Sequence, residues 1–336
     1  MDAFNSSAPI KIGFTPKRWR FATDVNILKK VDNPRDNGTR TIQLFPADAN
    51  MVNKRLGKRM LANAEATNTL AKDQYGSRKK HKAINACLNK VLLMDTLRIQ
   101  KRAGAIAMND AKGCYDRIVH TVAILVLMSF GLSHTPAKVM FEMLQTAEHN
   151  VKTGFGPSQR AYGQQSPPIQ GAGQGNGCAP ALWAMISSIM IRVMGKHNHG
   201  VNMRTSLSMT LISLVCFAFV DDTDLPVTAL TKDMTGEEVG PLFQQALDRW
   251  AGLLRATGGE LAPEKSWCYI IDFKWKGNKW EYRTIDEMDG DFTLTDNNGN
   301  RKPLRRLDVW EGSKTLGVFL AMDGSNACLL YTSDAA

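Results

Sequence analysis

The chain of 336 residues is basic, with 42 lysines and arginines against 32 acidic residues, and 43% of it is hydrophobic. This content is ample for a large core and predicts two domains or one composite domain. The net charge of +10 favours a polyanionic partner, nucleic acid before an anionic membrane, although many proteins are mildly basic. No apolar stretch reaches the ~20 residues of a membrane-spanning helix, no signal peptide is visible, and the six cysteines form no C-x-x-C pair. We therefore expect an intracellular protein of the cytoplasm or nucleus that is not secreted and not bound to a membrane.

Two strands are predicted near the start of the chain. Residues 19–30 and 40–44 are rich in apolar and basic side chains and flank a turn-rich loop, which predicts two joined strands. Lys30 and Arg40 lie at the ends of these strands, where basic side chains could grip a triphosphate. A solvated charged hairpin explains the same residues equally well.

Two basic helices and a buried strand follow. Helical spacing predicts one helix over residues 49–71 and another that opens at the basic cluster of residues 78–82. The basic faces of these helices suit a nucleic-acid track, or simply a solvated surface. A short apolar strand over residues 103–108 then leads to Asp110. Asp116 stands before the next apolar helix, where a carboxylate commonly caps the first turn.

A glycine-rich loop lies between two further predicted helices. The helices cover residues 136–150 and 181–195, and G-A-G-Q-G-N-G-C-A-P occupies residues 171–180 between them. Four glycines within seven residues would let the backbone approach a ligand closely. The segment resembles a phosphate-binding loop only loosely, because it lacks the Lys-Ser/Thr ending and no βαβ unit surrounds it.

A pair of carboxylates occupies the tip of a predicted buried hairpin. The apolar run at residues 211–220 ends at Asp221 and Asp222, and a second apolar run covers residues 225–230. Adjacent carboxylates in a buried turn repel each other and lose solvation, and a divalent cation such as Mg²⁺ removes both difficulties. The alternative is that polar residues simply fill a turn.

The rest of the chain combines one helix with short strands. An amphipathic helix over residues 236–257 ends at a Gly-Gly pair, and Lys265 follows in a short connection. The predicted strands and hairpins lie at residues 267–275, 280–283, 297–300 and 316–320.

The succession of five segments is more specific than any one of them. In order they are D-A-K-G-C-Y-D at residues 110–116, the glycine-rich segment, F-V-D-D at residues 219–222, the segment around Lys265, and T-L-G-V at residues 315–318. This succession resembles motifs A to E of reverse transcriptases, and most closely those of the non-LTR, LINE-type retrotransposons, over residues 19–323. The 111 residues between Asp110 and Asp221 agree with the resemblance.

The resemblance implies an α+β right-hand polymerase with fingers and palm, a central antiparallel sheet flanked by helices, and a thumb that is mostly missing. It implies fingers over residues 1–102 and a palm with an interleaved fingers segment over residues 103–310. A primer-grip region and the start of a thumb would cover residues 311–327. Residues 328–336 resemble a translated sequencing adapter, and we interpret them as a scar.

The resemblance also implies a role for each matching residue. Asp110 and Asp221 resemble the main ligands of Mg²⁺, with Asp222 in support and Mn²⁺ able to substitute, and Lys265 resembles the lysine that protonates pyrophosphate. The positions that resemble nucleotide-binding residues are Lys30, Arg40, Gln174 and Tyr115, the last as a steric gate against a ribose 2′-OH. Leu316 and Gly317 resemble the primer grip. The residues that depart from the family pattern are Cys114 in place of Ala, Ala179 in place of Ser and Thr41 in place of Pro.

The implied function is that of a retroelement RNA-directed DNA polymerase, a nucleotidyltransferase that binds an RNA template, a DNA primer and dNTPs. It would add each dNTP to the primer 3′-OH by two-metal catalysis. An RNA-directed RNA polymerase is one alternative, but such enzymes usually carry G-D-D and a second acidic residue in motif A, and Tyr115 favours deoxynucleotides. A non-catalytic nucleic-acid-binding remnant is the other, and the three retained carboxylates argue against it. The sequence leaves the oligomeric state open.

Overall fold

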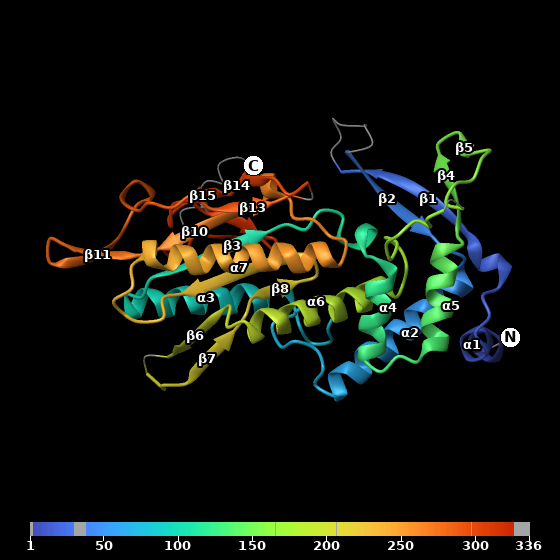
Figure 1. The fold of residues 1–336 in the computed structure, drawn as a ribbon, viewed down its shortest axis with the longest axis horizontal. Coiled ribbons are helices and arrows are strands. Elements are labelled where there is room, and N and C mark those ends of the chain that lie inside the picture. The colour runs from blue at the N-terminus through green and yellow to red at the C-terminus, as the bar shows by residue number, and fades with distance from the viewer. Residues whose placement is uncertain (1–2, 30–37, 165, 206, 297, 326–336) are drawn as a thin grey trace. The chain divides into compact units, whose positions relative to one another are not determined.

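The computed structural model describes residues 3–29, 38–164, 166–205, 207–296 and 298–325 (Figure 1). The chain divides into two compact units, which are described separately. Unit 1 comprises Met1–Leu70 and Gly113–Ile186, and unit 2 comprises Ala71–Lys112 and Ser187–Ala336. Lys30 and the proposed scar at residues 328–336 lie outside the described residues.

Unit 1 combines a four-stranded sheet with helices. The sheet has the order β2-β1-β4-β5, with β1 antiparallel to β2 and parallel to β4. The strands are β1 (Phe21–Leu28), β2 (Thr39–Leu44), β4 (Glu148–Thr153) and β5 (Gly156–Pro157). The helices are α1 (Ala3–Ile12), α2 (Ala47–Ala66), α4 (His120–Ser129) and α5 (His134–Gln145), and α6 (Ala179–Lys196) begins in this unit. β1 and β2 confirm the two strands predicted at the start of the chain.

Unit 2 is built on a five-stranded sheet of order β15-β10-β3-β9-β8. All its pairings are antiparallel except that of β10 with β15. The strands are β3 (Gly104–Asn109), β8 (Phe217–Phe219), β9 (Asp222–Thr228), β10 (Trp267–Ile271) and β15 (Arg305–Leu307), and the helices are α3 (Ala83–Gln100) and α7 (Gly236–Ala256). The two-stranded hairpins are β6 (Val201–Arg204) with β7 (Leu211–Leu214), β11 (Phe273–Lys276) with β12 (Lys279–Tyr282), β13 (Thr293–Thr295) with β14 (Arg301–Pro303), and β16 (Ser313–Thr315) with β17 (Val318–Leu320).

The central strand β3 is buried along its whole length because a helix covers each face of the sheet. Alternate strand residues point to opposite faces, and Ile106 and Met108 join the core formed with α3. On the other face α7 packs against β3 and β9, with Gly236 against Ile270 of β10. Both helices can be followed along the sheet in Figure 1.

Helix α7 shows how the local sequence sets a boundary. Thr235 accepts a hydrogen bond from the Glu238 N–H at 3.3 Å, and the Glu238 carboxylate accepts one from the Thr235 N–H at 2.8 Å. This capping box fixes the first turn. At the other end Gly258 has a φ of +93°, which favours glycine and ends the helix after Ala256.

Several predicted elements differ from the structure. The predicted strand at residues 211–220 is two strands, β7 and β8, which belong to different sheets. The predicted strand at residues 267–275 breaks at Asp272, whose carboxylate accepts hydrogen bonds from the Gly236 N–H and the Arg283 guanidinium. The predicted helix at residues 136–150 ends at Gln145 and gives way to β4. Among the described helices, none has the length and hydrophobicity to cross a membrane.

Candidate active site

Two of the three predicted metal-binding carboxylates occupy neighbouring positions at one end of the unit 2 sheet. Asp110 directly follows β3, and Asp222 is the first residue of β9. The antiparallel register pairs Asn109 with Thr223, so the next position along each strand is that of Asp110 and Asp222. Asp221 lies in the turn that joins β8 to β9. The sheet therefore brings the three residues to the same end.

The electrostatics of this end favour a cation. Burial, together with the negative charges of Asp221, Asp224 and Asp110, raises the pKa of Asp222 to about 6. Carboxylate oxygens and excess negative charge fit a hard divalent ion. However, the described residues include no three Asp, Glu, His or Cys side chains placed closely enough to hold a metal ion. The donor type and charge thus fit the ion, whereas a three-ligand arrangement is not formed.

Lys265 lies beside Asp110. Its ammonium Nζ is 3.5 Å from Asp110 Oδ2, and its side chain is 65% exposed. The backbone of this segment is tied to the end of β3, because the Ala262 N–H donates to the Asp110 carbonyl at 2.9 Å and the Asp110 N–H donates to Ser266 Oγ at 3.2 Å. The sequence separation of the two charges is 155 residues, yet the sheet places them in contact.

The turn that carries Asp221 is strained and closely supported. Val220 has a φ of +59°, which is rare for a β-branched residue. Gly76 lies against this residue: a Cβ at Gly76 would be 2.2 Å from the Val220 nitrogen. Gln74 forms a parallel bridge with Ala218 of β8, and the Asp73 carboxylate accepts a hydrogen bond from the Val215 N–H at 2.8 Å. The loop that connects α2 to α3 therefore supports the hairpin, which the sequence did not predict.

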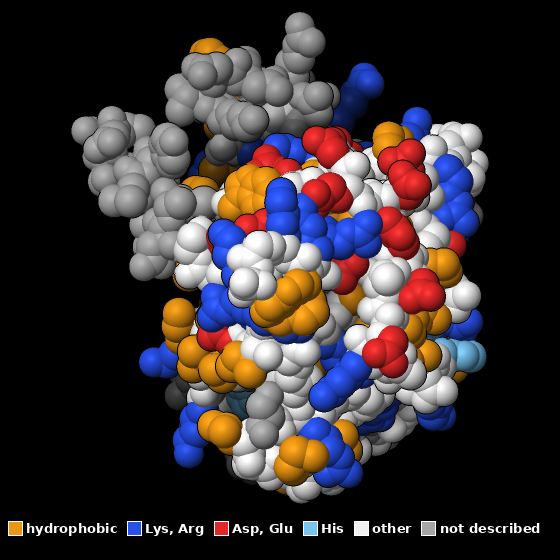
Figure 2. Space-filling model, turned by 90° about the vertical axis from the view of Figure 1, so that its left-hand side faces the viewer, with side chains coloured by type: hydrophobic (Ala, Val, Ile, Leu, Met, Phe, Trp, Pro, Cys, Tyr) orange, Lys and Arg blue, Asp and Glu red, His pale blue; other side chains and the backbone are white. Residues whose placement is uncertain are grey.

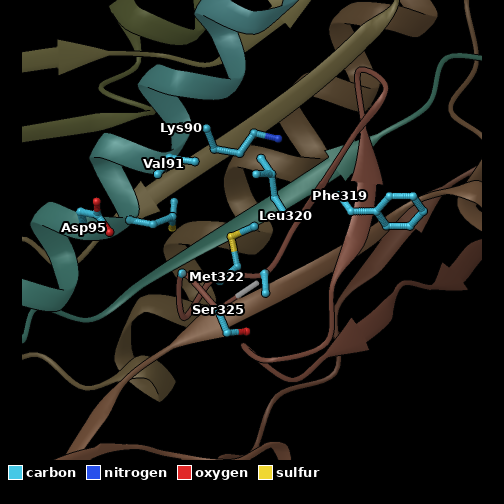
Figure 3. Close-up of a pocket in the computed structure, with 10 residues that line it drawn as sticks. Lys90, Val91, Asp95, Phe319, Leu320, Met322 and Ser325 are labelled. Carbon is cyan, nitrogen blue, oxygen red and sulfur yellow. The ribbon is translucent and has the colours of Figure 1, made fainter. Parts of the chain in front are cut away.

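A buried ion pair connects strand β9 to helix α3. Lys90 is fully buried, and its ammonium contacts the carboxylate of Asp224 on β9. The same ammonium donates to Thr315 Oγ1 of β16 at 3.0 Å. Figure 3 shows Lys90 beside Leu320 and Met322 at a cavity of about 120 Å³ between α3 and residues 319–325. Nothing in the local sequence of α3 marks this lysine, because its partners lie more than a hundred residues away.

The predicted primer-grip residues occupy a turn. We expected a strand over residues 316–320, but Leu316 and Gly317 join β16 to β17 with φ values of +50° and +83°. Thr315 precedes them and is held by Lys90. The two residues therefore lie at the tip of a hairpin whose first strand is anchored to α3.

Unit 1 brings together three of the predicted nucleotide-binding positions. Arg40 is exposed on β2, and the Gln43 N–H of the same strand donates to the Gln174 carbonyl at 2.6 Å. The Tyr115 carbonyl accepts a hydrogen bond from the Ala172 N–H at 2.7 Å. β2, the glycine-rich loop and the segment after Asp110 thus meet within this unit.

The glycine-rich loop is shaped by packing within unit 1. A Cβ at Gly175, whose φ is +125°, would lie 2.2 Å from the Gln43 carbonyl oxygen, and one at Gly177 would lie 2.6 Å from Lys54 Cβ. These glycines let the loop approach β2 and α2. We had attributed the glycines to close approach of a ligand, and the structure supplies a different reason at these two positions.

Asp116 does not cap a helix. It lies in a 3₁₀ turn, Cys114–Arg117, and α4 begins only at His120 with Val119 as its N-cap residue. The Asp116 carboxylate instead accepts a hydrogen bond from Gln174 Nε2 at 2.7 Å. Desolvation raises the pKa of this carboxyl, while the Gln174 hydrogen bond and the charges of Lys29 and Arg40 lower it. The capping prediction was therefore wrong, because the chain makes a short turn before the helix.

Comparison with known proteins identifies the family to which the chain is similar. The model of the reverse transcriptase (RNA-dependent DNA polymerase) family matches residues 27–285. Among solved structures, a telomerase from Candida albicans in complex with a fragment of telomeric RNA has 11% identity and a TM-score of 0.50, covering 79% of this chain and 45% of that one. An apo telomerase from Candida tropicalis has 12% identity and a TM-score of 0.50, covering 74% of this chain and 44% of that one.

These structural matches establish similarity of fold alone, and the chain spans less than half the length of either telomerase. A comparison with curated proteins finds no match. The family model, in contrast, covers well over half of the chain, including the ends of β3 and β9. The chain therefore belongs to the reverse transcriptase family of RNA-directed DNA polymerases, which are nucleotidyltransferases.

Proposed function

We propose that this chain is the polymerase domain of a non-LTR retroelement, which copies an RNA template by adding dNTPs to a DNA primer. The observation that carries the proposal is that Asp110, Asp221 and Asp222 lie at one end of the unit 2 sheet, where burial and the neighbouring carboxylates raise the pKa of Asp222. Such an accumulation of charge costs stability unless a cation or a proton balances it. The family match supports the same chemistry.

The three carboxylates would hold Mg²⁺, or Mn²⁺ in its place. When bound, a pair of such ions stabilises the attacking and leaving oxygens of an in-line displacement at phosphorus. Asp110 and Asp222 come from adjacent strands of one sheet, so the backbone hydrogen bonds of β3 and β9 fix their separation. Lys265 supplies a positive charge to this end of the sheet through its contact with Asp110. Because the Lys265 side chain is exposed, it would be able to move toward a leaving pyrophosphate and donate a proton.

The residues of unit 1 would orient the incoming nucleotide. Arg40 projects from β2 with its side chain exposed, and a guanidinium is suited to bind phosphate oxygens in pairs. Gln174 is restrained by its hydrogen bond to Asp116, which prepares it to contact the base or the template. Tyr115 would exclude the 2′-OH of a ribonucleotide.

A primer-extension assay tests the proposal directly. With a DNA primer on an RNA template, we expect extension by dNTPs in Mg²⁺, little extension by rNTPs, and none after addition of EDTA. A preference for rNTPs would identify an RNA polymerase instead. Binding of Mn²⁺, measured by titration without nucleotides, should weaken in the Asp221→Asn protein, and unchanged Mn²⁺ affinity would contradict the metal assignment independently of activity.

A further inference from the structure

A hairpin in unit 2 places aromatic and basic side chains on opposite faces. β11 and β12 are joined by Gly277 and Asn278, both with positive φ, as in a type I′ turn. The register pairs Phe273 with Tyr282 and Trp275 with Trp280 on one face. The other face carries the pairs Lys274–Glu281 and Lys276–Lys279.

The inner half of this hairpin is anchored. The Phe273 and Tyr282 rings pack with centroids 4.8 Å apart, and Lys101 lies over the Phe273 ring at 5.1 Å. Arg283 donates to the Asp272 carboxylate at 3.1 Å. These contacts hold the base of the hairpin to the unit 2 core and give its outer half a defined direction.

The outer half exposes its tryptophans. Trp275 is 59% exposed and Trp280 is 48% exposed, and their rings meet edge to face with centroids 5.4 Å apart. The cross-strand pair stabilises the hairpin itself, but this contact uses only an edge of one ring and one face of the other. Large aromatic surfaces that stay in contact with water are typical of a binding surface.

The charges of the hairpin indicate the chemistry of the partner. Lys276 and Lys279 face each other directly across the strands, an arrangement that destabilises a hairpin in isolation. Lys279 forms an ion pair with Glu281 at 2.8 Å, whereas Lys274 contacts Glu287 and Arg283 pairs with Asp272 and Glu237. The tip of the hairpin, with Lys276 and Lys279 against Glu281, keeps a net positive charge. A like-charge pair that costs stability is explained by a polyanion that neutralises it. Figure 2 shows the corresponding end of the molecule, where hydrophobic side chains lie next to lysines and arginines.

The hairpin lies away from the carboxylates. β10 begins opposite Met108, close to Asp110, and runs to Ile271 opposite Gly104 at the far end of β3. β11 continues beyond that end in Figure 1. Trp275 is thus on the order of 30 Å from Asp110 along the strand direction, at about 3.3 Å per residue.

We propose that the outer half of the β11–β12 hairpin is a second contact site for single-stranded nucleic acid, separate from the polymerase site. Bases stack on Trp275 and Trp280, and phosphates pair with Lys276 and Lys279. Stacking accepts any base because each has a π-face, so the site binds RNA and DNA alike. It holds the strand to the protein without reading its sequence.

Fluorescence anisotropy with the full chain tests this site by measuring the affinity for labelled oligouridine and oligothymidine, each of about 20 nucleotides, and for a duplex of about 20 base pairs. Replacing both tryptophans (Trp275→Leu with Trp280→Leu) should weaken binding of both single strands by about 10- to 100-fold, since each base–aromatic stack contributes strongly. Duplex binding should change little. The matched control is Trp310→Leu, which removes a 45% exposed tryptophan outside the hairpin.

A charge variant separates binding from folding. Lys276→Gln with Lys279→Gln removes the like-charge pair, so it should not destabilise the hairpin, while the dependence of log Kd on log salt concentration should fall by about 1.4 for two lost phosphate contacts. The control is Lys232→Gln, which changes an exposed lysine outside the hairpin. In this variant the slope of log Kd against log salt concentration should change by no more than about 0.7, the value for one phosphate contact.

Wild-type affinity and salt dependence in both hairpin variants would overturn the proposal, as would an equal loss in the Trp310→Leu protein. Unchanged binding of nucleic acid in the hairpin variants is also the result expected if the partner of the hairpin is another protein. Single-turnover extension of a saturating primer–template should be unchanged by the hairpin variants. An inactive polymerase would contradict the function proposed above and leave the hairpin result standing.

Discussion

Asp221 and Asp222 are neighbours in sequence but differ in structural position. Asp221 follows the strained Val220 in the turn, whereas Asp222 is paired with Phe219 as the first residue of β9. Only Asp222 is opposite the end of β3 in the register. The two carboxylates are therefore held in different ways, and we expect their loss to have different effects.

We predict that Asp221→Asn abolishes primer extension, whereas Asp222→Asn leaves residual activity that is greater in Mn²⁺ than in Mg²⁺. Asparagine keeps the size of the side chain and removes its charge, so no cavity is opened. Affinity for the primer–template, measured by gel shift, should persist in both because phosphate contacts dominate it. Full activity of the Asp221→Asn protein would contradict the catalytic assignment.

We predict that Tyr115→Ala increases rNTP incorporation relative to dNTP incorporation. The ring is removed, but the Tyr115 carbonyl keeps its hydrogen bond from Ala172, so the backbone should hold its position. The measurement is the ratio of kcat/KM for the two sugars on the same template. If this ratio does not change, Tyr115 serves packing and not sugar selection.

The sequence predicted some of these residues better than others. The position of Asp110, Asp221 and Asp222 at one end of the sheet could be predicted, because an apolar run that ends in carboxylates is visible locally, while their role as metal ligands remains a prediction. Gly76 and Lys90 could not, because their contacts with Val220 and Asp224 join positions more than a hundred residues apart. The capping role of Asp116 was predicted wrongly because Asp116 lies within a single turn of 3₁₀ helix that precedes α4.

At the scale of elements, the loop between α2 and α3 and the β8–β9 hairpin behave as one structure. The Tyr75 N–H donates to the Ala218 carbonyl at 2.7 Å, and a Cβ at Gly76 would lie 2.2 Å from the Val220 nitrogen and 2.9 Å from the Val220 Cα. A side chain at Gly76 would press on the turn before Asp221.

We predict that Gly76→Ala destabilises the protein by about 1–3 kcal/mol, the usual cost of overpacking, and lowers extension further by displacing Asp221. Thermal unfolding and single-turnover extension measure the two effects. The control is Gly252→Ala in α7, where a Cβ meets nothing within 4 Å and where alanine should stabilise the helix by about 0.5–1 kcal/mol. Equal behaviour of the two variants would refute the contact.

The Lys90–Asp224 pair connects three elements, α3, β9 and β16. We predict that Lys90→Met lowers the free energy of unfolding by about 3–5 kcal/mol, because it leaves the Asp224 charge buried without a partner. Arg301→Met, which breaks the exposed pair with Asp248, should cost no more than about 1 kcal/mol. Urea denaturation compares the two, and a similar small loss in both would show that Asp224 is neutralised in another way.

Element boundaries were the least predictable part of the fold. The run at residues 211–220 is largely hydrophobic throughout, yet the chain passes from one sheet to another near Cys216. This break depends on tertiary pairing, so the local hydrophobic pattern does not reveal it. Asp272 breaks the strand at residues 267–275 because its carboxylate is used by Gly236 and Arg283. Helices α6 and α7 were predicted more closely, since the 3.6-residue period extends over many turns in both, whereas the helices predicted over residues 49–71 and 136–150 extend beyond the ends of α2 and α5.

At the scale of the whole molecule, the predicted α+β class is confirmed, as is membership of the reverse transcriptase family. The order of the five motif segments carried that prediction, because each segment alone is compatible with ordinary turns and loops. The assignment to the non-LTR group and the predicted domain boundaries remain predictions. The two units interleave in sequence, so a division by consecutive residues could describe them only approximately.

The central position of β3 has a consequence for synthesis of the chain. Both neighbours of β3 in the sheet, β9 and β10, are translated after it, and about 110 residues separate Asn109 from Asp222. At about 5–20 residues per second, the ribosome needs roughly 5 to 20 s to deliver the first partner of this apolar strand. During that interval the residues of unit 1 from Gly113 to Ile186 are complete, while β3 has two open edges. We therefore expect nascent chains stalled before residue 217 to bind chaperones and to aggregate. Chains released after residue 271 should bind chaperones less and remain unaggregated.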